Sequence, residues 1–187
     1  MDAISYREQQ VALLLRERGV YALCDLDGDL DGTPIYVGQS TDGVRQRVQR
    51  HLTSARSDVI ANRQIDVWEI AYVWGWVEPE PGRINQIEAR LFHDFDPTSP
   101  LMNGSVPANP DAIEFDLPEE IVVQVMSDDE IATRREPPFR LPRQAEHYQP
   151  LVDHILNVKD APELRRALRA HSARLQAYHE RFLDPDA

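Results

Sequence analysis

Four side chains in the first half of the chain have types and spacings that suit the chemistry of phosphate esters. Tyr21 and Tyr36 lie in two short runs of β-prone residues, so their phenols can meet on one face of a hairpin. A phenol beside a cation can bind a water or phosphate oxygen and accept a proton. Arg47 offers a fork of N–H donors to two phosphate oxygens, and Glu88 offers a carboxylate to a magnesium ion. These residue types are compatible with hydrolysis assisted by one divalent cation.

The pattern of apolar residues predicts the elements that must position these side chains. Val44, Val48 and Leu52 recur four residues apart, which places them on one face of a helix. In chain order we expect a helix over residues 5–18, strands over 20–24 and 33–38, a helix over 41–57, a strand over 67–77 and a helix over 84–95. This order predicts an α/β fold over residues 1–105, with a small three-stranded antiparallel sheet flanked by helices.

The chain changes character after residue 105. The segment from Asp111 to Glu130 holds eight acidic residues and no lysine or arginine, and it includes a strand predicted over 121–126. Prolines are frequent over residues 134–144, which predicts an extended linker. Helices are expected over 145–158 and 162–182. We therefore expect residues 106–187 to form an acidic, proline-rich C-terminal extension that ends in helices.

Five sequence elements in the first domain resemble those of the GIY-YIG nuclease family. Gly19-Val20-Tyr21 and Tyr36-Val37-Gly38 match the paired tripeptides of that family, on two adjacent predicted strands. Arg47-Val48-Gln49-Arg50-His51 looks like its Arg-x-x-x-His element, in the helix that follows. Glu88 lies on the next helix, where the family keeps its metal-binding carboxylate, and Asn103 matches the asparagine that closes the domain. The order of five elements is far more specific than either tripeptide alone.

The resemblance implies a metal-dependent endonuclease that hydrolyses DNA phosphodiester bonds with Mg²⁺ or Mn²⁺. Tyr21 or Tyr36 would act as the general base, and Glu88 would bind the metal ion. Arg47, with or without help from His51, would hold the phosphate, and Asn103 would order the site. The implied catalytic residues are Tyr21, Tyr36, Arg47, His51, Glu88 and Asn103. A catalytically silent binding module on the same fold, and a restriction-type nuclease with its own sequence recognition, are the alternatives.

Two assignments stay open at the level of sequence. The spacing from Tyr36 to the predicted helix also allows Arg45 to be the phosphate-binding arginine in place of Arg47. A histidine near a helix end is often structural or capping, so His51 has either that role or a catalytic one. The basic face expected to contact nucleic acid comprises Arg45, Arg47, Arg50 and Arg56.

The net charge of −12 is unusual for a protein whose partner is a polyanion. Twelve acids in two segments equal the whole excess: the eight in residues 111–130 and Asp25, Asp27, Asp29 and Asp31. The aspartates of the second segment fail the spacing of a calcium-binding EF-hand loop, so a solvated hairpin loop is expected there. Residues 39–64 carry five arginines against two aspartates, a local balance of +3. We therefore expect weak, strongly salt-sensitive DNA binding through a local basic face.

The remaining features concern location and partners. Cys24 is the single cysteine and lies in a predicted strand, which suits a buried thiol in a reducing compartment. No apolar run approaches the length of a membrane span, so we expect a cytoplasmic protein without membrane contact. The arginines of the last predicted helix favour a solvated face, with a phosphate backbone or a partner subunit in a possible homo-oligomer as alternatives.

Overall fold

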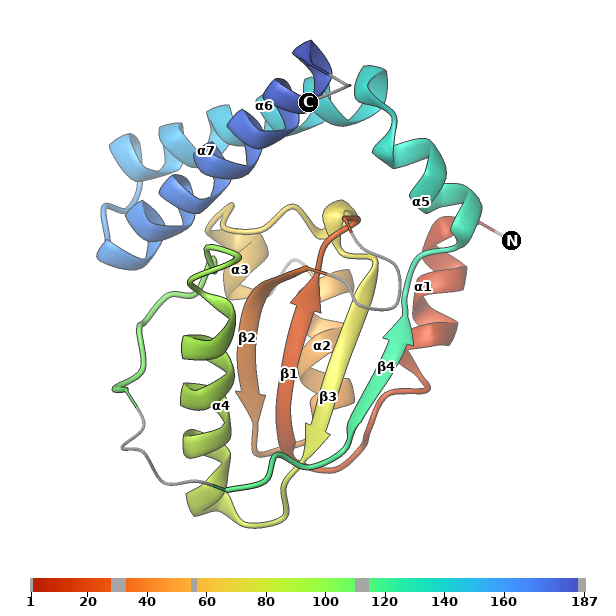
Figure 1. Ribbon diagram of the computed structural model, residues 1–187, viewed down its shortest axis with the longest axis vertical. Helices are drawn as coiled ribbons and strands as arrows, with labels where there is room; N and C mark the ends of the chain where they lie inside the picture. Colours follow the sequence, from red (N-terminus) through yellow and green to blue (C-terminus); the bar gives the residue numbers. More distant parts are fainter. Residues whose placement is uncertain (1, 28–32, 55–56, 110–114, 185–187) are drawn as a thin grey trace.

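A four-stranded antiparallel sheet in the order β2-β1-β3-β4 forms the centre of the computed structural model (Figure 1). The structure describes residues 2–27, 33–54, 57–109 and 115–184. The strands are β1 Gly19–Cys24, β2 Pro34–Ser40, β3 Tyr72–Val77 and β4 Glu120–Gln124. β1 pairs with both β2 and β3, and β2 forms one edge of the sheet. The predicted α/β class and antiparallel sheet are confirmed.

The predicted number of three strands is wrong, because β4 joins the sheet from beyond residue 105. It pairs antiparallel with β3, and Val122 lies opposite Trp74. The strand predicted over residues 121–126 therefore exists, but it belongs to the central sheet. Without it, the outer side of β3 would expose a row of unpaired backbone N–H and C=O groups. The pairing covers that edge and connects the C-terminal extension to the first 105 residues.

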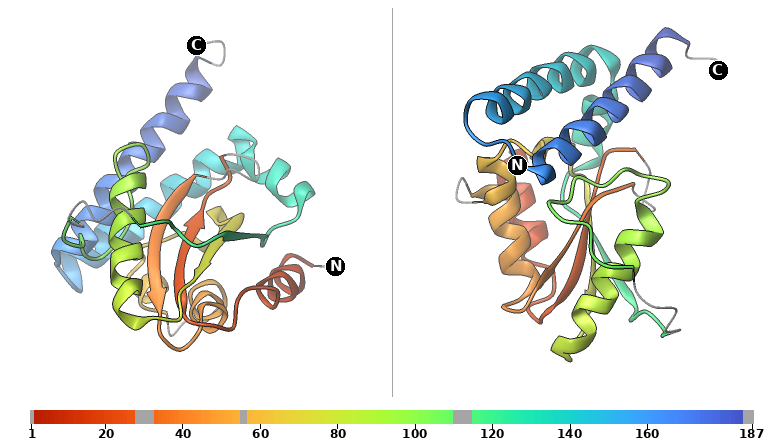
Figure 2. Two further views of the ribbon diagram at one scale, coloured as in Figure 1. Left: turned by 60° about the horizontal axis from the view of Figure 1, so that its bottom comes forward. Right: turned by 90° about the vertical axis from the view of Figure 1, so that its left-hand side faces the viewer.

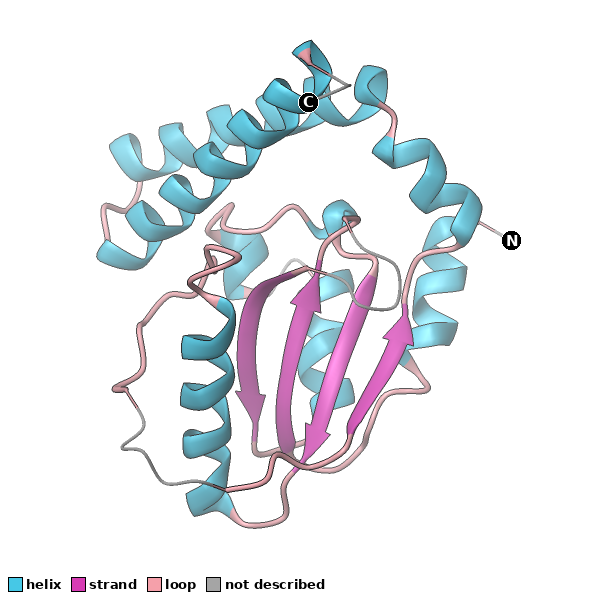
Figure 3. Ribbon diagram, in the orientation of Figure 1, coloured by secondary structure: helices cyan, strands magenta, loops and turns pink. Residues whose placement is uncertain are grey.

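Helices cover both faces of the sheet, as the side view in Figure 2 shows. One face packs on α1 Ala3–Val11 and α2 Val44–Thr53, and the other packs on α4 Pro81–Phe95 (Figure 3). Side chains alternate along β1, so Tyr21 and Leu23 join the α2 side of the core while Val20 and Ala22 join the α4 side. The sheet thus separates two buried apolar clusters and fixes α2 and α4 on opposite sides of β2.

Several predicted boundaries are corrected by local hydrogen bonds. The first helix ends at Val11 rather than at residue 18. The helix expected over 41–57 is α2 followed by a short separate helix, α3 Asp58–Ala61. The third strand begins at Tyr72 because residues 67–69 form a 3₁₀ turn, η1, in which the Trp68 N–H donates to the Asp66 carboxylate.

The linker predicted over residues 134–144 is wrong, since most of it is helical. The helices are α5 Asp128–Arg135, α6 Pro137–Asn157 and α7 Pro162–Leu183. Pro137 and Pro138 occupy the first turn of α6, where the backbone N–H groups have no intrahelical partner and proline costs nothing. α6 and α7 form a pair that lies across one end of the sheet (Figure 1). In the described ranges, no helix combines the length and apolarity needed to cross a bilayer.

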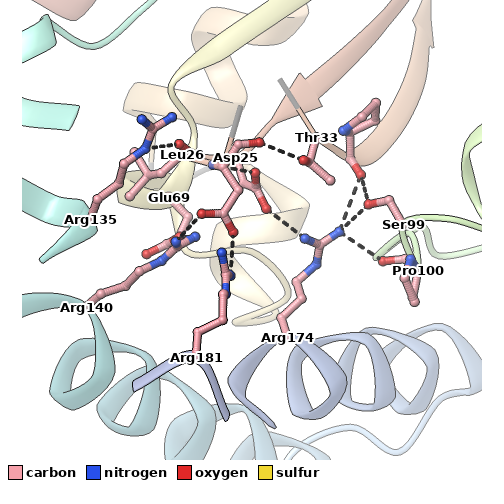
Figure 4. Close-up of polar contacts among 12 residues, drawn as sticks. Asp25, Leu26, Thr33, Glu69, Ser99, Pro100, Arg135, Arg140, Arg174 and Arg181 are labelled. Atoms are coloured by element: carbon pink, nitrogen blue, oxygen red, sulfur yellow. Dashed lines mark hydrogen bonds and ion pairs between the residues drawn. The ribbon is translucent and has the colours of Figure 1, made fainter. Parts of the chain in front are cut away.

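The two described aspartates of the aspartate-rich segment, Asp25 and Asp27, form ion pairs and are not the solvated loop residues that the sequence predicts. Asp25 is 1% exposed and receives a 2.7 Å hydrogen bond from Arg174 of α7 (Figure 4). Asp27 receives bonds of 2.6 Å from Arg140 and 2.9 Å from Arg181. On the last helix, the prediction of a solvated arginine face is wrong for Arg174, whose side chain is 12% exposed, whereas the side chains of Arg165 and Arg181 are 61% and 59% exposed. Asp29 and Asp31 lie outside the described residues.

Candidate active site

The β1–β2 hairpin brings the two predicted tyrosines together. Tyr21 lies opposite Gly38 in the register, so Tyr36, two residues before Gly38, projects from the same face of the sheet. The two ring centroids are 6.2 Å apart. A Cβ atom at residue 38 would lie only 2.6 Å from the Tyr21 hydroxyl oxygen, so only glycine leaves room for that phenol. The spacing of the tripeptides thus has a steric reason.

His51 connects Tyr21 to a serine through a buried chain of hydrogen bonds. The imidazole is fully buried, with Nε2 2.8 Å from the Tyr21 hydroxyl and Nδ1 2.9 Å from Ser57 Oγ. Burial, reinforced by the positive charge of Arg47, lowers the pKa of His51 to about 4. The ring is therefore neutral at pH 7. In one neutral tautomer, Nδ1–H donates to Ser57 while Nε2 accepts from the Tyr21 phenol.

This buried histidine should make the stability of the protein pH-dependent. Unfolding returns the His51 pKa from about 4 to its ordinary value of 6.5, so the unfolded chain binds the proton first as the pH falls. The contribution of neutral His51 is complete above pH 6.5 and is lost between pH 6.5 and 4. We expect the difference in unfolding free energy between wild type and His51→Gln to shrink by about 3 kcal/mol over that range. Urea unfolding at pH 7, 5.5 and 4 measures it.

The control for this experiment is His179→Gln, because His179 is exposed on α7. This variant shows how the loss of an exposed imidazole changes the unfolding free energy over the same pH range. A His51→Gln difference that stays flat over that range would mean that folding leaves the pKa of His51 unchanged.

Arg47 of α2 is the cation beside the phenols. Its side chain is 27% exposed, and Nη2 lies 3.5 Å from the Asp58 carboxylate. Burial raises the pKa of Tyr36 to about 12, with Asp58 adding to the rise and Arg47 opposing it. Burial also raises the pKa of Tyr21, again against the influence of Arg47. Both phenols are therefore protonated at neutral pH, and Arg47 is the group that favours their ionisation.

The other predicted arginines lie away from this cluster. Arg45 donates from Nε at 2.9 Å and Nη2 at 2.6 Å to the carbonyl oxygen of Leu14, so it fastens α2 to the segment after α1. Arg50 is exposed on the outer side of α2. Arg56 lies outside the described residues. Of the three described arginines, the structure thus places only Arg47 next to the tyrosines.

Glu88 approaches the same edge strand from the opposite face of the sheet. It is half-buried on α4, and its Oε2 accepts a 2.7 Å hydrogen bond from Nε2 of Gln39, a β2 residue. Gln39 also donates to Asn85 on α4 at 2.8 Å. Burial raises the pKa of Glu88, and the Glu88 carboxylate in turn contributes to the raised pKa of Tyr36. The carboxylate and the phenol therefore interact across the edge of β2.

Asn103 closes the free edge of β2 like one more strand residue. Its Oδ1 accepts a 3.0 Å hydrogen bond from the Val37 N–H, and its Nδ2 donates to the Val37 carbonyl at 2.5 Å. The Met102 N–H donates to the carbonyl of Ile35 at 2.7 Å. These bonds grip the backbone on both sides of Tyr36. Asn103 is 7% exposed and holds the strand in position without touching the phenols directly.

The fit of a metal ion depends on Glu88. Among the residues that the structure describes, no three His, Cys, Asp or Glu side chains form a group that could hold a metal ion. Within the same ranges, Oε1 of Glu88 has no hydrogen-bond partner. One free carboxylate oxygen at a half-buried edge suits a magnesium ion, which keeps several waters and needs only one or two protein ligands.

Three contributors to this cluster are missed by sequence reasoning. Gln39 positions Glu88, Ser57 orients His51, and Asp58 pairs with Arg47. Gln39 lies two residues after Val37, so strand alternation could have placed it on the α4 side. Ser57 and Asp58 follow the end of α2 and carry no such signal. Comparison of the chain with models of protein families, with curated proteins and with solved structures gave no match.

Proposed function

We propose that this chain is a metal-dependent endonuclease of the GIY-YIG type that hydrolyses DNA phosphodiester bonds. One observation carries the proposal: two phenols and an arginine on one face of the sheet meet a half-buried carboxylate from the other face, at the free edge of β2. A phosphate group at that edge would have a cation, proton-transfer groups and a metal-binding oxygen within reach. That set of groups can both activate a water molecule and stabilise the charge that develops in its attack.

The side chains divide the work of hydrolysis. The proton of the attacking water would pass to the Tyr21 oxygen as the phenol proton moves to Nε2 of neutral His51, 2.8 Å away. The two transfers must be concerted, because the raised pKa of Tyr21 and the pKa of about 4 of His51 oppose prior ionisation of the phenol. Ser57 holds the imidazole in the orientation that accepts this proton. A divalent ion at Glu88 would supply positive charge that polarises the phosphate, favours ionisation of the nearby phenol and stabilises the leaving oxygen.

Arg47 would bind the phosphate under attack. Its guanidinium is partly exposed and already lies beside a carboxylate, that of Asp58, whose oxygens resemble those of a phosphate. A substrate phosphate must compete with Asp58 for this fork. Because Asp58 is 58% exposed, its ion pair with Arg47 is weak and easily replaced.

A binding module without catalysis is the second candidate. The net charge of −12 and the acidic Asp58 beside Arg47 favour weak contact with DNA or contact with a protein instead. A restriction-type enzyme with its own sequence recognition is a narrower form of the first candidate, and it predicts cutting at one site. On a panel of DNA substrates, a binding module would cut none, a restriction-type enzyme would cut at one sequence, and a general nuclease would cut without that restriction.

The test is a panel of supercoiled plasmid, linear duplex and branched DNA, incubated with Mg²⁺, Mn²⁺ or EDTA. We expect nicking that requires the metal ion and disappears in Glu88→Gln. The matched control is Asp94→Asn, which removes an exposed carboxylate from the same helix and should cut like wild type. Binding of DNA without nicking by any variant would support the binding module and refute the proposed activity.

A further inference from the structure

A hollow of about 660 Å³ lies between the first half of α7 and the loop that follows α4. Its floor on the loop side is formed by Pro100, Leu101 and Val106. On the α7 side, Arg166, Arg169, Ala170 and Ala173 line it at spacings of three, one and three residues, so they share one helix face. Ala170 and Ala173 have small side chains, so they leave open space next to the arginine side chains. Pro162, Arg165 and Asp96 complete the lining, so the hollow has three arginines and one aspartate and is an open surface rather than an enclosed apolar pocket.

The hollow adjoins the candidate active site through the loop that closes β2. Leu101 is only two residues from Asn103, which holds the backbone beside Tyr36. The next residue, Gly104, packs on the first turn of α7: a Cβ atom there would lie 3.3 Å from Cβ of Glu163. Figure 1 shows this half of α7 above the same side of the sheet as β2 and α4. One ligand lying along the edge of β2 would thus reach both places.

The arginines of this surface are available to a ligand to different degrees. Arg169 is exposed and has no partner in the described part of the chain. Arg165 is 61% exposed and makes two hydrogen bonds of 2.6 Å to Asp160, which is 53% exposed. Arg166 lies deeper and pairs with Asp96. An incoming anion can therefore engage Arg169 directly, whereas at Arg165 it must displace an exposed carboxylate.

We propose that this face of α7, formed by Arg165, Arg166 and Arg169, binds the phosphodiester backbone of the DNA that enters the candidate active site. The inference rests on the proposed nuclease function and adds a second contact to it. Duplex DNA carries one charge per about 1.7 Å of its axis, so a duplex held at Arg47 must present further phosphates alongside the site. The basic face lies on that path. It would bind without regard to sequence, because phosphate contacts carry no base information.

This contact also resolves the conflict between DNA binding and a net charge of −12. Most of the other C-terminal arginines are neutralised internally, as Arg174 by Asp25 and Arg140 by Glu69. On the α7 face, Arg165 and Arg166 have acidic partners of their own, and Arg169 has none among the described residues. An anion is therefore attracted to Arg169 and its surroundings rather than to the surface as a whole. Arg47 would hold the scissile phosphate and the α7 face would hold the flank.

The test measures binding of a 30-base-pair duplex in the Glu88→Gln background without divalent ions, over a range of salt concentrations. Arg165→Gln/Arg169→Gln should weaken binding about tenfold and lower the slope of log K against log[salt] by roughly two. The charge-matched control is Arg90→Gln/Arg181→Gln, since both side chains are well exposed and lie outside the hollow. It should leave slope and affinity within twofold. Inorganic phosphate at constant ionic strength should not displace the duplex, which separates a DNA surface from a simple anion site.

Equal slopes for the two double variants, or no measurable duplex binding by the parent protein, would overturn the inference. Stronger competition by poly-glutamate than by DNA would also overturn it, by assigning the face to an acidic protein. The outcomes separate the two proposals. If nicking requires Glu88 but DNA binding and nicking are unchanged in Arg165→Gln/Arg169→Gln, only the proposed α7 contact is refuted. If the slope of log K against log[salt] falls in Arg165→Gln/Arg169→Gln but the wild-type protein nicks no DNA, the nuclease function is refuted and the α7 contact is retained.

Discussion

Arg47→Ala is expected to slow single-turnover DNA nicking by about 10²–10³-fold, with a much smaller loss of DNA affinity. Arg47 is the cation that opposes the raised pKa of both Tyr21 and Tyr36, and it is exposed enough to meet a phosphate. Its removal would weaken phosphate binding in the transition state and leave the phenols harder to ionise. Arg47→Lys should recover only part of the rate, because an ammonium group cannot make two parallel hydrogen bonds.

Arg45→Ala is the control that decides between the two arginines. The Arg45 guanidinium donates to the Leu14 carbonyl and not to the candidate active site. The variant should therefore unfold at a lower temperature but cut at the wild-type rate while it is folded. The rates at a temperature where both variants are folded give the answer. Loss of rate in Arg45→Ala, with Arg47→Ala active, would make Arg45 the phosphate-binding residue.

Arg140→Met is expected to lower the free energy of unfolding by about 3–5 kcal/mol. Arg140 is 6% exposed and donates to Glu69 at 2.8 Å and to Asp27 at 2.6 Å, with its guanidinium 3.7 Å from the centre of the Tyr178 ring. Glu69 is 7% exposed, and burial raises its pKa to about 7 even with Arg140 beside it. Without that partner, the buried Glu69 would lose its hydrogen bonds from the Arg140 guanidinium and would have to take up a proton or stay ionised and unpaired.

A second substitution separates the loss of the partner from the loss of packing. Arg140→Met/Glu69→Gln should recover part of the stability at pH 7, because the remaining amide carries no charge. The surface control is Arg165→Met, whose partner is exposed, and it should unfold like wild type. Denaturant unfolding at pH 7 measures all three. If Arg140→Met unfolds like the surface control, the buried network does not hold the C-terminal helices to the sheet.

The sequence predicts those parts of the fold whose signal is local. The β1–β2 hairpin and α2 follow from short runs of apolar residues, and both lie close to their expected positions. The partner of β4 could not be predicted, because its burial pattern is only weakly alternating and its neighbour β3 lies more than 40 residues earlier. The linker prediction failed because Pro137 and Pro138, in the first turn of α6, look locally like prolines of an extended segment, and because α6 also accommodates Pro142 in its interior.

The acidic loop shows the same limit for charged residues. Asp25 and Asp27 have the composition of a solvated turn, and the arginines that bury them lie 113 to 154 residues further along the chain. Only the docking of α6 and α7 brings these charges together. A local sequence pattern cannot distinguish an aspartate that stays solvated from one that forms a buried ion pair with a residue far along the chain.

The candidate site divides in a similar way. The tripeptides place Tyr21 and Tyr36 on one face of the hairpin, and the register and the space at Gly38 agree with that arrangement. Arg45 and Arg47 lie two residues apart on the same predicted helix, so only the fold separates a backbone contact from a place beside the phenols. The bond from Gln39 to Glu88 depends on how α4 packs on β2, which no spacing reveals. The catalytic roles of these residues stay predictions.

The most direct test of the central claim is the rate of a single turnover, measured with protein in excess over the best substrate of the DNA panel. This design removes substrate affinity from the comparison. We expect wild type to cut with Mg²⁺ or Mn²⁺ and not with EDTA, and Glu88→Gln to be slower by about 10³-fold while binding DNA equally well. Equal rates for wild type and Glu88→Gln, or cutting that persists in EDTA, would contradict a metal-dependent site at the edge of β2.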